Sequence, residues 1–334
     1  MRSSGIREKS IDVMKGILIL MVVWGHIVFY VGLYSGIALK TSPFVYTAFI
    51  SNNFIAPYYM AAFFWVTGYC SSYRRRFRDQ VVIDFRRLVV PAVIIPVLMS
   101  FFFSPPLESF QRTLINTLHL KLPWFLLACF LSKNMLYAFR GVKLRWLKLT
   151  IQLLLSFLGC YLLEKYKEYN YICLFHAMAF VPFVAIGHEM RNLEIKDKWI
   201  IPSVMIYGVI IIAFILSKRV VPSLCGIITF PAYLYPVYVV LAILGTIIWF
   251  IISRKIGSSL VLEYLGRNSL VIYLTHFSFF SVATYILKSF ILENSDRFFP
   301  SLFIVMFMFI GATVWSCAWI NVLNTKYLKW IIGK

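Results

Sequence analysis

The chain has 334 residues, of which 61% are hydrophobic, 18% aromatic and 14% charged, and its mean hydropathy is +0.81. Soluble globular proteins carry about 25% charged residues, so this composition excludes a soluble globular chain and indicates a polytopic membrane protein. The net charge of +20 comes mostly from short basic clusters between apolar runs. The positive-inside rule explains such clusters, so we do not expect nucleic-acid binding.

The first apolar stretch carries three polar side chains into an otherwise hydrophobic segment. Asp12, Lys15 and His26 stand among Ile, Leu, Met, Val and Trp residues. An α-helix turns about 100° per residue, so Lys15 and His26 share one face at a separation of about 16 Å. We expect this partly polar stripe to consist of Asp12, Lys15, Ile19, Val22, His26 and Tyr30.

Ten segments are apolar enough to cross a membrane, for which about 20 residues are needed. The predicted spans are residues 13–34, 54–73, 88–103, 122–139, 149–163, 171–190, 199–217, 230–252, 269–288 and 300–321. The third and fifth are short. The eighth is ambiguous, because Pro222, Pro231 and Pro236 favour its division into a re-entrant piece and a span.

The distribution of Lys and Arg predicts the orientation of the chain. Of the 33 basic residues, 22 lie in the terminal segments and alternate loops, against 9 in the other loops. Short cytoplasmic loops carry the excess of Lys and Arg, so both termini are predicted to be cytoplasmic. No loop is long enough for a separate domain, and we expect residues 1–334 to form one all-α integral-membrane domain of about ten transmembrane helices. The six cysteines lack the paired spacing of a zinc site or a disulfide framework.

His26 is the strongest candidate for catalysis. A histidine is the usual general base near neutral pH, and ionisable residues inside a membrane span mark functional sites by default. The structural alternative is a histidine that only bonds a neighbouring helix for packing. The alignment of Asp12 and Lys15 with His26 favours function, because both reach the predicted cytosolic interface on the same helix face.

The densest basic segment follows the second predicted span. Its arginines are Arg74, Arg75, Arg76, Arg78, Arg86 and Arg87. Topology alone explains some of them. Guanidinium groups at this density also suit the phosphates of a nucleotide-bearing donor such as coenzyme A, and anionic lipid headgroups are the alternative ligand.

Four further stretches combine polar and aromatic residues at span ends, namely residues 63–69, 122–127, 180–191 and 264–276. Each has a structural explanation when taken alone: Trp124 as an interfacial aromatic residue, Gly68 and Gly187 as close helix contacts, and Asn268 with Ser269 as a helix cap. The remaining histidines are His119, His176, His188 and His276. No two histidines stand at i, i+3 or i, i+4, and no metal site is predicted.

Taken in order, these stretches resemble the bacterial membrane acyltransferase type 3 family, which includes the O-acetyltransferases of surface polysaccharides. The opening motif is matched by Asp12, Lys15, Gly16 and His26. Residues 63–69 are similar to a Phe-Phe-x-x-Ser-Gly segment, 86–91 to the arginines and proline that follow, 122–127 to Leu-Trp-Phe-Leu, 180–191 to Phe-x-x-x-Gly-x-x-x-Arg and 265–276 to Leu-Gly-x-x-Ser-x-x-x-Tyr-x-x-His.

Two residues depart from the family pattern. Lys15 stands where the family usually has Arg, and Thr67 where it has Ser. Lysine keeps the positive charge but loses the bidentate fork of a guanidinium group. Members that resemble fucose O-acetylases also carry Lys-Gly at this place, so the change points to a branch within the family.

The resemblance implies a multi-pass protein of the bacterial inner membrane that transfers an acyl group from a cytosolic acyl-CoA to a carbohydrate hydroxyl. We expect His26 to be the general base, Asp12 or a structural neighbour to orient its imidazole, and Lys15 to stabilise developing negative charge. An acyl-histidine intermediate is the mechanistic alternative. The donor is expected to be acetyl-CoA, held by the arginines of residues 74–87, and the acceptor a lipid-linked or surface glycan. The residues expected to contact substrate or support the site are Trp124, Ser269, Tyr273 and His276.

A second function class fits the same composition. A transporter or flippase for a lipid-linked glycan would also need many spans, polar residues inside them and basic loops. Transfer of label from acyl-CoA to a glycan, as opposed to movement of the glycan alone, separates the two interpretations.

Overall fold

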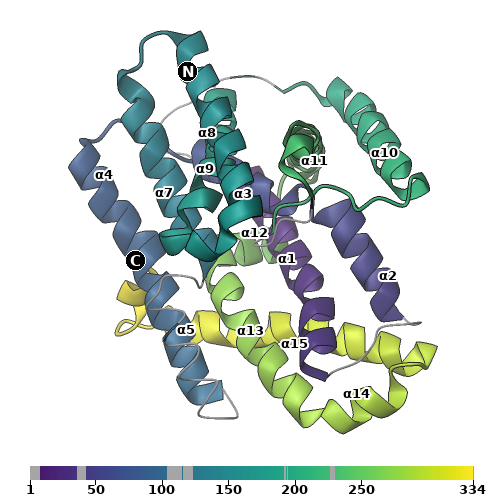
Figure 1. Cartoon of the computed structure of the whole chain (residues 1–334). Helices are drawn as coiled ribbons and strands as arrows, with labels where there is room; N and C mark the ends of the chain where they lie inside the picture. Colours follow the sequence, from purple (N-terminus) through teal and green to yellow (C-terminus); the bar gives the residue numbers. More distant parts are fainter. Residues whose placement is uncertain are drawn as a thin grey trace.

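The computed structural model describes residues 8–35, 43–103, 115, 123–191, 193, 195–225 and 230–333. Over these residues the chain is built from helices and contains no β-strand. Among them, seven helices are long and apolar enough to cross a membrane. The chain is therefore an all-α polytopic membrane protein, as predicted (Figure 1).

The helices are given in the order in which they follow one another along the chain. The α-helices are α1 (Lys9–Ser35), α2 (Pro43–Phe49), α3 (Tyr59–Tyr69), α4 (Phe77–Asp84), α5 (Val90–Phe103), α7 (Trp124–Ala138), α8 (Arg145–Tyr166), α9 (Leu174–Met190), α10 (Ile200–Leu216), α11 (Tyr235–Ile256), α12 (Leu260–Arg267), α13 (Ser269–Ile286), α14 (Lys288–Asn294) and α15 (Phe298–Leu323). The π-helical turns are η1 (Ile50–Ile55) and η2 (Phe85–Val89). The 3₁₀ turns are η3 (Phe139–Gly141), η4 (Lys167–Tyr169), η5 (Tyr171–Cys173), η6 (Asp197–Trp199), η7 (Ala232–Leu234) and η8 (Lys329–Ile332).

Each predicted span overlaps a helix, but the lengths differ from expectation. Seven spans coincide with the long apolar helices α1, α8, α9, α10, α11, α13 and α15. The other three fall on α3, α5 and α7, which have 11, 14 and 15 residues. The fifth span, expected to be short, is the 22-residue α8. In the eighth, Pro236 stands in the first turn of α11, where proline is tolerated, and the helix continues to Ile256.

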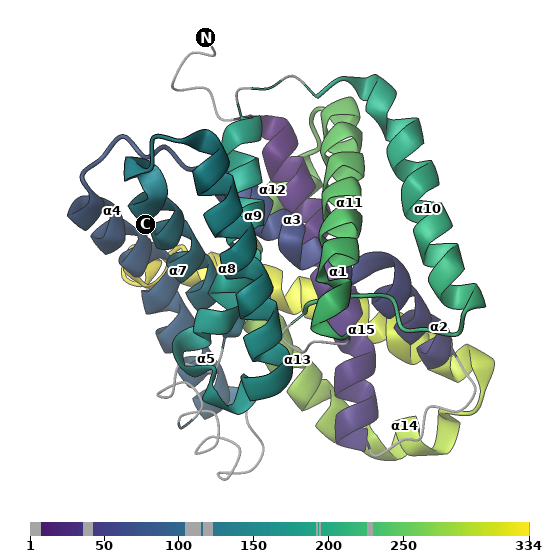
Figure 2. The ribbon, with the colours of Figure 1, turned by 45° about the horizontal axis from the view of Figure 1, so that its top comes forward.

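Helix α1 lies within the bundle and contacts α3, α11, α12, α13 and α15 (Figures 1 and 2). The predicted stripe faces this interior: Asp12, Ile19 and Val22 are buried, and Lys15 and His26 are partly buried. The long helices near the site therefore pack around α1.

The contact between α1 and α12 requires two glycines. A Cβ atom on Gly16 of α1 would collide with the carbonyl oxygen of Leu262, and one on Gly266 of α12 would collide with the carbonyl oxygen of Asp12. The missing side chains allow the two backbones to touch, as small residues do in membrane helix pairs. This contact places the start of α1 directly against the turn that leads into α13.

The predicted close contact at Gly68 and Gly187 is also present. A Cβ atom on Gly68 of α3 would collide with the carbonyl of Val184, and one on Gly187 of α9 with the carbonyl of Trp65. The two glycines therefore let α3 and α9 approach each other reciprocally. Helix packing therefore accounts for the glycines in two of the segments that resemble the family, residues 63–69 and 180–191.

Loops predicted to be cytoplasmic meet one another at one end of the bundle. The Tyr69 hydroxyl donates to a Glu8 carboxylate oxygen at 2.9 Å, and Arg254 Nη1 donates to the Ile195 carbonyl at 2.6 Å. These bonds join the segment before α1 to the end of α3, and the end of α11 to the loop after α9. The position of these loops at one end agrees with the distribution of Lys and Arg among the loops. That distribution remains the reason to place this end in the cytosol.

Helix α10 stands at the edge of the bundle beside α11 (Figure 2). Its side chains are largely exposed and apolar, with Ile201, Val209 and Leu216 among the most exposed. An apolar surface of this kind is stable in contact with lipid hydrocarbon. The Tyr207 hydroxyl donates to the Phe54 carbonyl at 2.9 Å and attaches α10 to the segment before α3.

Candidate functional site

Two histidines from opposite ends of the sequence meet inside the bundle. His26 Nδ1 on α1 lies 3.1 Å from His276 Nε2 on α13. His276 Nδ1 in turn lies 2.8 Å from the carbonyl oxygen of Ile272, four residues earlier on α13. His276 is 0% exposed, whereas His26 keeps part of its surface accessible. The two rings therefore form one hydrogen-bonded unit whose accessible member is His26.

Aromatic rings surround the histidine pair. The Phe277 ring lies 4.8 Å from the His26 ring and 4.0 Å from the His276 ring, measured between centroids. The Tyr30 ring packs against Phe277 at 5.1 Å, and the Tyr273 ring lies 6.2 Å from His276. In apolar surroundings a hydrogen bond between polar groups is stronger than in water, and rotation of either ring is restricted.

A second polar group lies at the start of α7 and α9. Tyr273 contacts Phe125 at 5.2 Å, and the adjacent Trp124 packs on the His176 ring at 4.6 Å. The Asn170 side-chain nitrogen lies 2.6 Å from His176 Nδ1. The predicted residues Trp124, Tyr273 and His276 therefore belong to a chain of neighbouring rings, to which His176 adds a polar member.

The turn before α9 is held in an unusual backbone conformation. Ile172 and Cys173 have φ angles of 52° and 60°, in the left-handed region that costs an L-residue about 1–2 kcal/mol. The Phe175 backbone nitrogen donates to the Asn170 side-chain oxygen at 2.8 Å, which ties the turn to the helix start. Such strain clusters at functional sites, and here it positions His176 one turn into α9.

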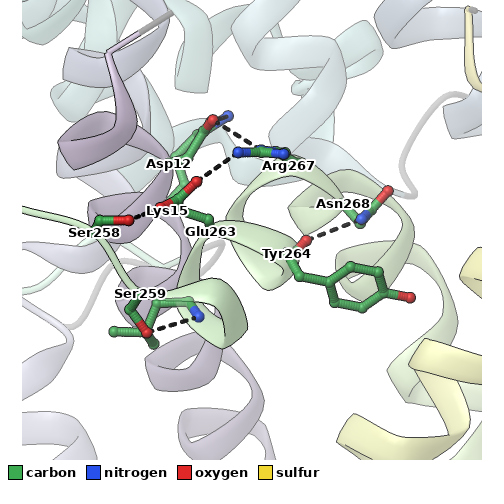
Figure 3. A network of polar contacts seen from close by, with 9 residues as sticks. Asp12, Lys15, Ser258, Ser259, Glu263, Tyr264, Arg267 and Asn268 are labelled. Carbon is green, nitrogen blue, oxygen red and sulfur yellow. Dashed lines mark hydrogen bonds and ion pairs between the residues drawn. The ribbon is translucent and has the colours of Figure 1, made fainter.

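Asp12 and Lys15 belong to a separate ionic network at the start of α1 (Figure 3). Lys15 Nζ lies 3.0 Å from Asp12 Oδ1, and Arg267 Nε lies 3.4 Å from Asp12 Oδ2. Arg267 Nη2 also lies 2.5 Å from Glu263 Oε2, and the Ser258 hydroxyl donates to Glu263 Oε1 at 2.7 Å. The network joins α1 to α12 across the glycine contact.

Helix geometry separates this network from the histidine pair. Asp12 precedes His26 by fourteen residues, about 21 Å along α1, and Lys15 precedes it by about 16 Å. The polar side chain that contacts the His26 imidazole is His276, whereas Asp12 lies in the other group. The structure brings together His26, His276 and Tyr273 in one group, and Asp12 and Lys15 in another.

Ser269 begins α13 between the two groups, and the residue before it does not cap that helix as expected. The Asn268 side-chain nitrogen donates to the Tyr264 carbonyl at 2.9 Å, so it bonds back into α12 (Figure 3). The side chain adds a second hydrogen bond to a carbonyl at the end of α12 that already accepts from the Asn268 backbone nitrogen at 3.2 Å, and it gives no cap at the start of α13.

Glu263 is the acidic member of the network that lies outside the membrane-spanning helices. Its side chain is buried, and the hydrogen bond from Ser258 holds the pKa of the carboxyl below its usual range. The positive charges of Lys9 and Arg267 act in the same direction. The fold therefore favours the ionised form of Glu263.

The six predicted donor-binding arginines are all exposed. They lie in the loop after α3, in α4 and in η2. The Tyr137 hydroxyl donates to the Arg75 carbonyl, and Arg140 Nη1 donates to the Tyr73 carbonyl at 2.6 Å, so the end of α7 holds this loop. An open hollow of about 480 Å³ adjoins it, lined by Phe77, Tyr137, Ala138, Arg140 and Gly141.

A buried carboxylate within this basic segment was not singled out from the sequence. Asp84 at the end of α4 accepts a bond of 2.6 Å from Lys133 Nζ on α7 and bonds of 2.9 Å from the Gln80 amide. The i, i+4 spacing of Gln80 and Asp84 was visible in the sequence, whereas the Lys133 partner on another helix was not. The Asp84 charge is neutralised inside the protein, so the exposed arginines keep a net positive surface.

Sequence reasoning also missed the role of Arg267, which it counted only as a topological charge. The Glu263 and Arg267 pair stands at i, i+4, a spacing that indicates a salt bridge on a helix. No local signal pairs His26 with His276, because 250 residues separate them. Of the other histidines, His188 packs on Tyr73 at 4.8 Å, and His119 lies outside the described residues.

The fold and the site define a class: a polytopic helical membrane protein with a partly accessible histidine at the centre of its bundle. The family model for an acyltransferase domain matches residues 8–321. The chain belongs to the acyltransferase type 3 family of membrane proteins and is an acyl-transferring enzyme. No curated protein and no solved structure matches the chain.

Proposed function

We propose that this enzyme is an O-acyltransferase of the bacterial inner membrane that moves an acetyl group from acetyl-CoA to a sugar hydroxyl of a lipid-linked or surface polysaccharide. Family membership supports acyl transfer in general. The observation that carries the assignment of the site is the partly accessible His26, bonded at 3.1 Å to a fully buried His276.

The chemistry of the acceptor explains the need for a base. A sugar hydroxyl is a poor nucleophile until its proton is removed, and a positioned histidine contributes about 10²–10⁴-fold to such a step. A ring nitrogen of His26 takes the hydroxyl proton while the oxygen attacks the thioester carbonyl carbon. The new C–O bond forms, the C–S bond breaks, and the leaving coenzyme A thiolate takes the proton from the imidazolium.

The exposed arginines support a donor site at the end of the bundle that the charge pattern places in the cytosol. Arg74, Arg75 and Arg76 lie close in sequence beside the hollow at the end of α7. Guanidinium groups bind phosphate oxygens through charge-assisted hydrogen bonds. Lys15, whose side chain is partly exposed beside Asp12, adds positive charge at the same end of α1.

Replacement of His26 tests the proposed base. We expect His26→Ala and His26→Gln to lower the rate of acetyl transfer to glycan by about 10²-fold or more, because the proton acceptor is lost. The rate is measured with radiolabelled acetyl-CoA and membranes that contain equal amounts of folded protein. His188→Gln, on α9 away from the histidine pair, serves as the matched control. Full transfer by both His26 variants would show that another group is the base.

Replacement of the loop arginines tests the donor site separately. We expect the triple change of Arg74, Arg75 and Arg76 to Gln to weaken coenzyme A binding by about tenfold or more, because charge-assisted phosphate contacts are lost. Calorimetry of the purified protein measures the affinity. The control changes Lys326 and Lys329, exposed cations near the chain's end, to Gln. Unchanged affinity in the triple variant would place the phosphate site elsewhere.

A further inference from the structure

We infer that His276 is a positioning residue that fixes His26 in the tautomer with hydrogen on Nδ1, so that His26 Nε2 is the nitrogen presented to the acceptor hydroxyl. The assignment of Nε2 as the catalytic nitrogen rests on the proposed function. The hydrogen-bond pattern itself rests on the geometry of the two rings and of two carbonyls, that of Ile272 beside His276 and that of Val22, which also bonds the His26 ring.

The direction of each hydrogen bond follows from the Ile272 carbonyl. A carbonyl oxygen can only accept, so His276 Nδ1, at 2.8 Å from it, carries a hydrogen. A neutral imidazole has one N–H group, so His276 Nε2 is then a lone-pair acceptor. His26 Nδ1, at 3.1 Å from that acceptor, must be the donor. His26 Nε2 is left with its lone pair, which is the form a general base needs.

The neutral state of both rings follows from their surroundings. The pair is packed against the Phe277 and Phe280 rings, and a charge buried among apolar rings without a counter-charge is costly. If His276 were an imidazolium, its Nε2 would also donate, and His26 Nδ1 would have to be the acceptor. The His26 ring would then present an N–H group at Nε2 and could not remove a proton.

The different burial of the two rings assigns their roles. His276 is 0% exposed and both of its nitrogens already have partners, so it has no atom to offer a substrate. His26 is partly exposed, and only its Nδ1 is used by the pair. His276 therefore acts through His26, in the way that the carboxylate of a serine protease holds the catalytic histidine in one tautomer.

Nitrogen NMR tests the tautomer without any need for activity. The chain has five histidines, so ¹⁵N-histidine-labelled protein gives a small set of ring signals, and the His26→Gln variant identifies those of His26. Protonated and lone-pair ring nitrogens differ widely in chemical shift. We expect His26 Nδ1 to be protonated and Nε2 to carry the lone pair at neutral pH. A protonated His26 Nε2 would overturn the inference.

A matched pair of variants tests what His276 supplies. Glutamine places an amide oxygen near the position of His276 Nε2 and can accept the His26 Nδ1 hydrogen, whereas methionine has a similar length and offers only a weak sulfur acceptor. We expect His276→Met to lower kcat by about 10–100-fold, as loss of a supporting partner does, and His276→Gln to recover most of that loss. The His26 signals of His276→Met should change to a mixture of tautomers.

The outcomes separate this inference from the proposed function. Equal activity and equal His26 spectra in His276→Met and His276→Gln, with equal melting temperatures, would show that His276 only fills space. If no sugar acetylation is found in the wild-type enzyme, the proposed function fails, but the spectra still report the tautomer. If acetylation is found and the spectra show hydrogen on Nε2, the positioning role fails alone.

Discussion

Glu263 illustrates how one side chain can support the site without lying in it. It bonds the Ser258 hydroxyl and the Arg267 guanidinium, and Arg267 also reaches Asp12 on α1. Glu263 is buried whereas Arg267 is about half exposed, so removal of a Glu263 partner leaves a buried carboxylate less well compensated, at a cost that solvent around Arg267 reduces. The Glu263 carboxylate therefore contributes to the attachment of α12 to α1.

The lowered pKa of Glu263 predicts a pH dependence of stability. Folding favours the ionised form, so its contribution is complete above the usual pKa of a glutamate and is lost as pH falls through the lowered value. We expect Glu263→Gln to melt at a lower temperature than wild type at pH 7, and the gap between the two melting temperatures to narrow as the pH falls below about 4. Thermal unfolding in detergent across this range measures the difference.

The control for this experiment is Glu189→Gln, because Glu189 is exposed at the end of α9. Its melting temperature should follow that of wild type at every pH. A constant gap between Glu263→Gln and wild type down to acid pH would contradict the prediction, since it would mean that the charge of Glu263 contributes nothing.

At the residue scale, the sequence predicted which side chains are special better than it predicted their partners. The inward face of α1, from Asp12 to His26, follows from helical periodicity, because the angle between residues is fixed by local geometry. The separation of Lys15 from the histidine also follows from it. The partners, Arg267 and His276, depend on how α12 and α13 pack on α1, which no local pattern of the chain encodes.

Among the helices, α1 and α12 bring their backbones into direct contact where they cross. The two glycines there allow the carbonyls of Leu262 and Asp12 to touch the opposite backbone. Because α12 leads through Asn268 directly into α13, the position of α12 also sets the depth of His276 relative to His26. A shift at this crossing would therefore open the histidine pair.

The Gly16 contact predicts a loss of stability on adding one methyl group. We expect Gly16→Ala to lower the free energy of unfolding by about 1–3 kcal/mol, because the Leu262 backbone must move to admit the Cβ atom. Gly208→Ala on α10 is the control, since a Cβ atom there meets nothing within 4 Å. The control should be unchanged or slightly more stable, because alanine favours helix over glycine.

Denaturant unfolding of the detergent-solubilised protein, followed by tryptophan fluorescence, measures both changes. Equal stability of the two alanine variants would mean that α12 can move away from α1 at no cost. In that case the crossing would not determine the position of His276.

Helix positions were predictable from hydropathy, but their lengths were not. Apolar runs locate α1, α8, α9, α10, α11, α13 and α15, because a helix that crosses hydrocarbon must satisfy its own backbone hydrogen bonds. The segments of α3, α5 and α7 are also apolar in the sequence. Helix α3 nevertheless has only 11 residues, and it packs closely against α9. Packing within the protein, and not the thickness of the membrane alone, decides where such helices end.

On the scale of the whole molecule, the charge pattern assigns one end of the bundle to the cytosol. That end carries the exposed arginines, the ionic network of α1 and the loops joined by Tyr69 and Arg254. The proposed donor site therefore lies at the cytosolic end, while the histidine pair lies about 21 Å further along α1 than Asp12. Under the proposed function, the acyl group therefore reaches the histidines through the interior of the bundle.

The orientation can be tested with a native cysteine. Cys70 at the end of α3 has an exposed thiol outside any disulfide. We expect a membrane-impermeant maleimide to label it in inside-out vesicles and not in right-side-out vesicles, because the loop after α3 is predicted to be cytosolic. Mass spectrometry of the labelled peptide gives the result.

The Cys70→Ser variant shows which part of the label belongs to this position. Labelling of Cys70 from the outer side only would reverse the whole topology. The arginines would then lie away from the cytosolic pool of coenzyme A, and the proposed donor site would be wrong.

The long separation of the site residues has a consequence for biosynthesis. The His26 and His276 pair spans 250 residues, and the Asp12 and Arg267 pair spans 255. Helix α1 leaves the ribosome first, so its acid, its lysine and its histidine enter the membrane before α12 and α13 exist. Until then Asp12 and Lys15 have each other, but Asp12 lacks Arg267 and His26 lacks His276, and a polar ring without its partner inside the membrane is costly. Chains that stop before α12 should therefore be recognised and degraded by membrane proteases, and the histidine pair forms only when the last quarter of the chain is inserted.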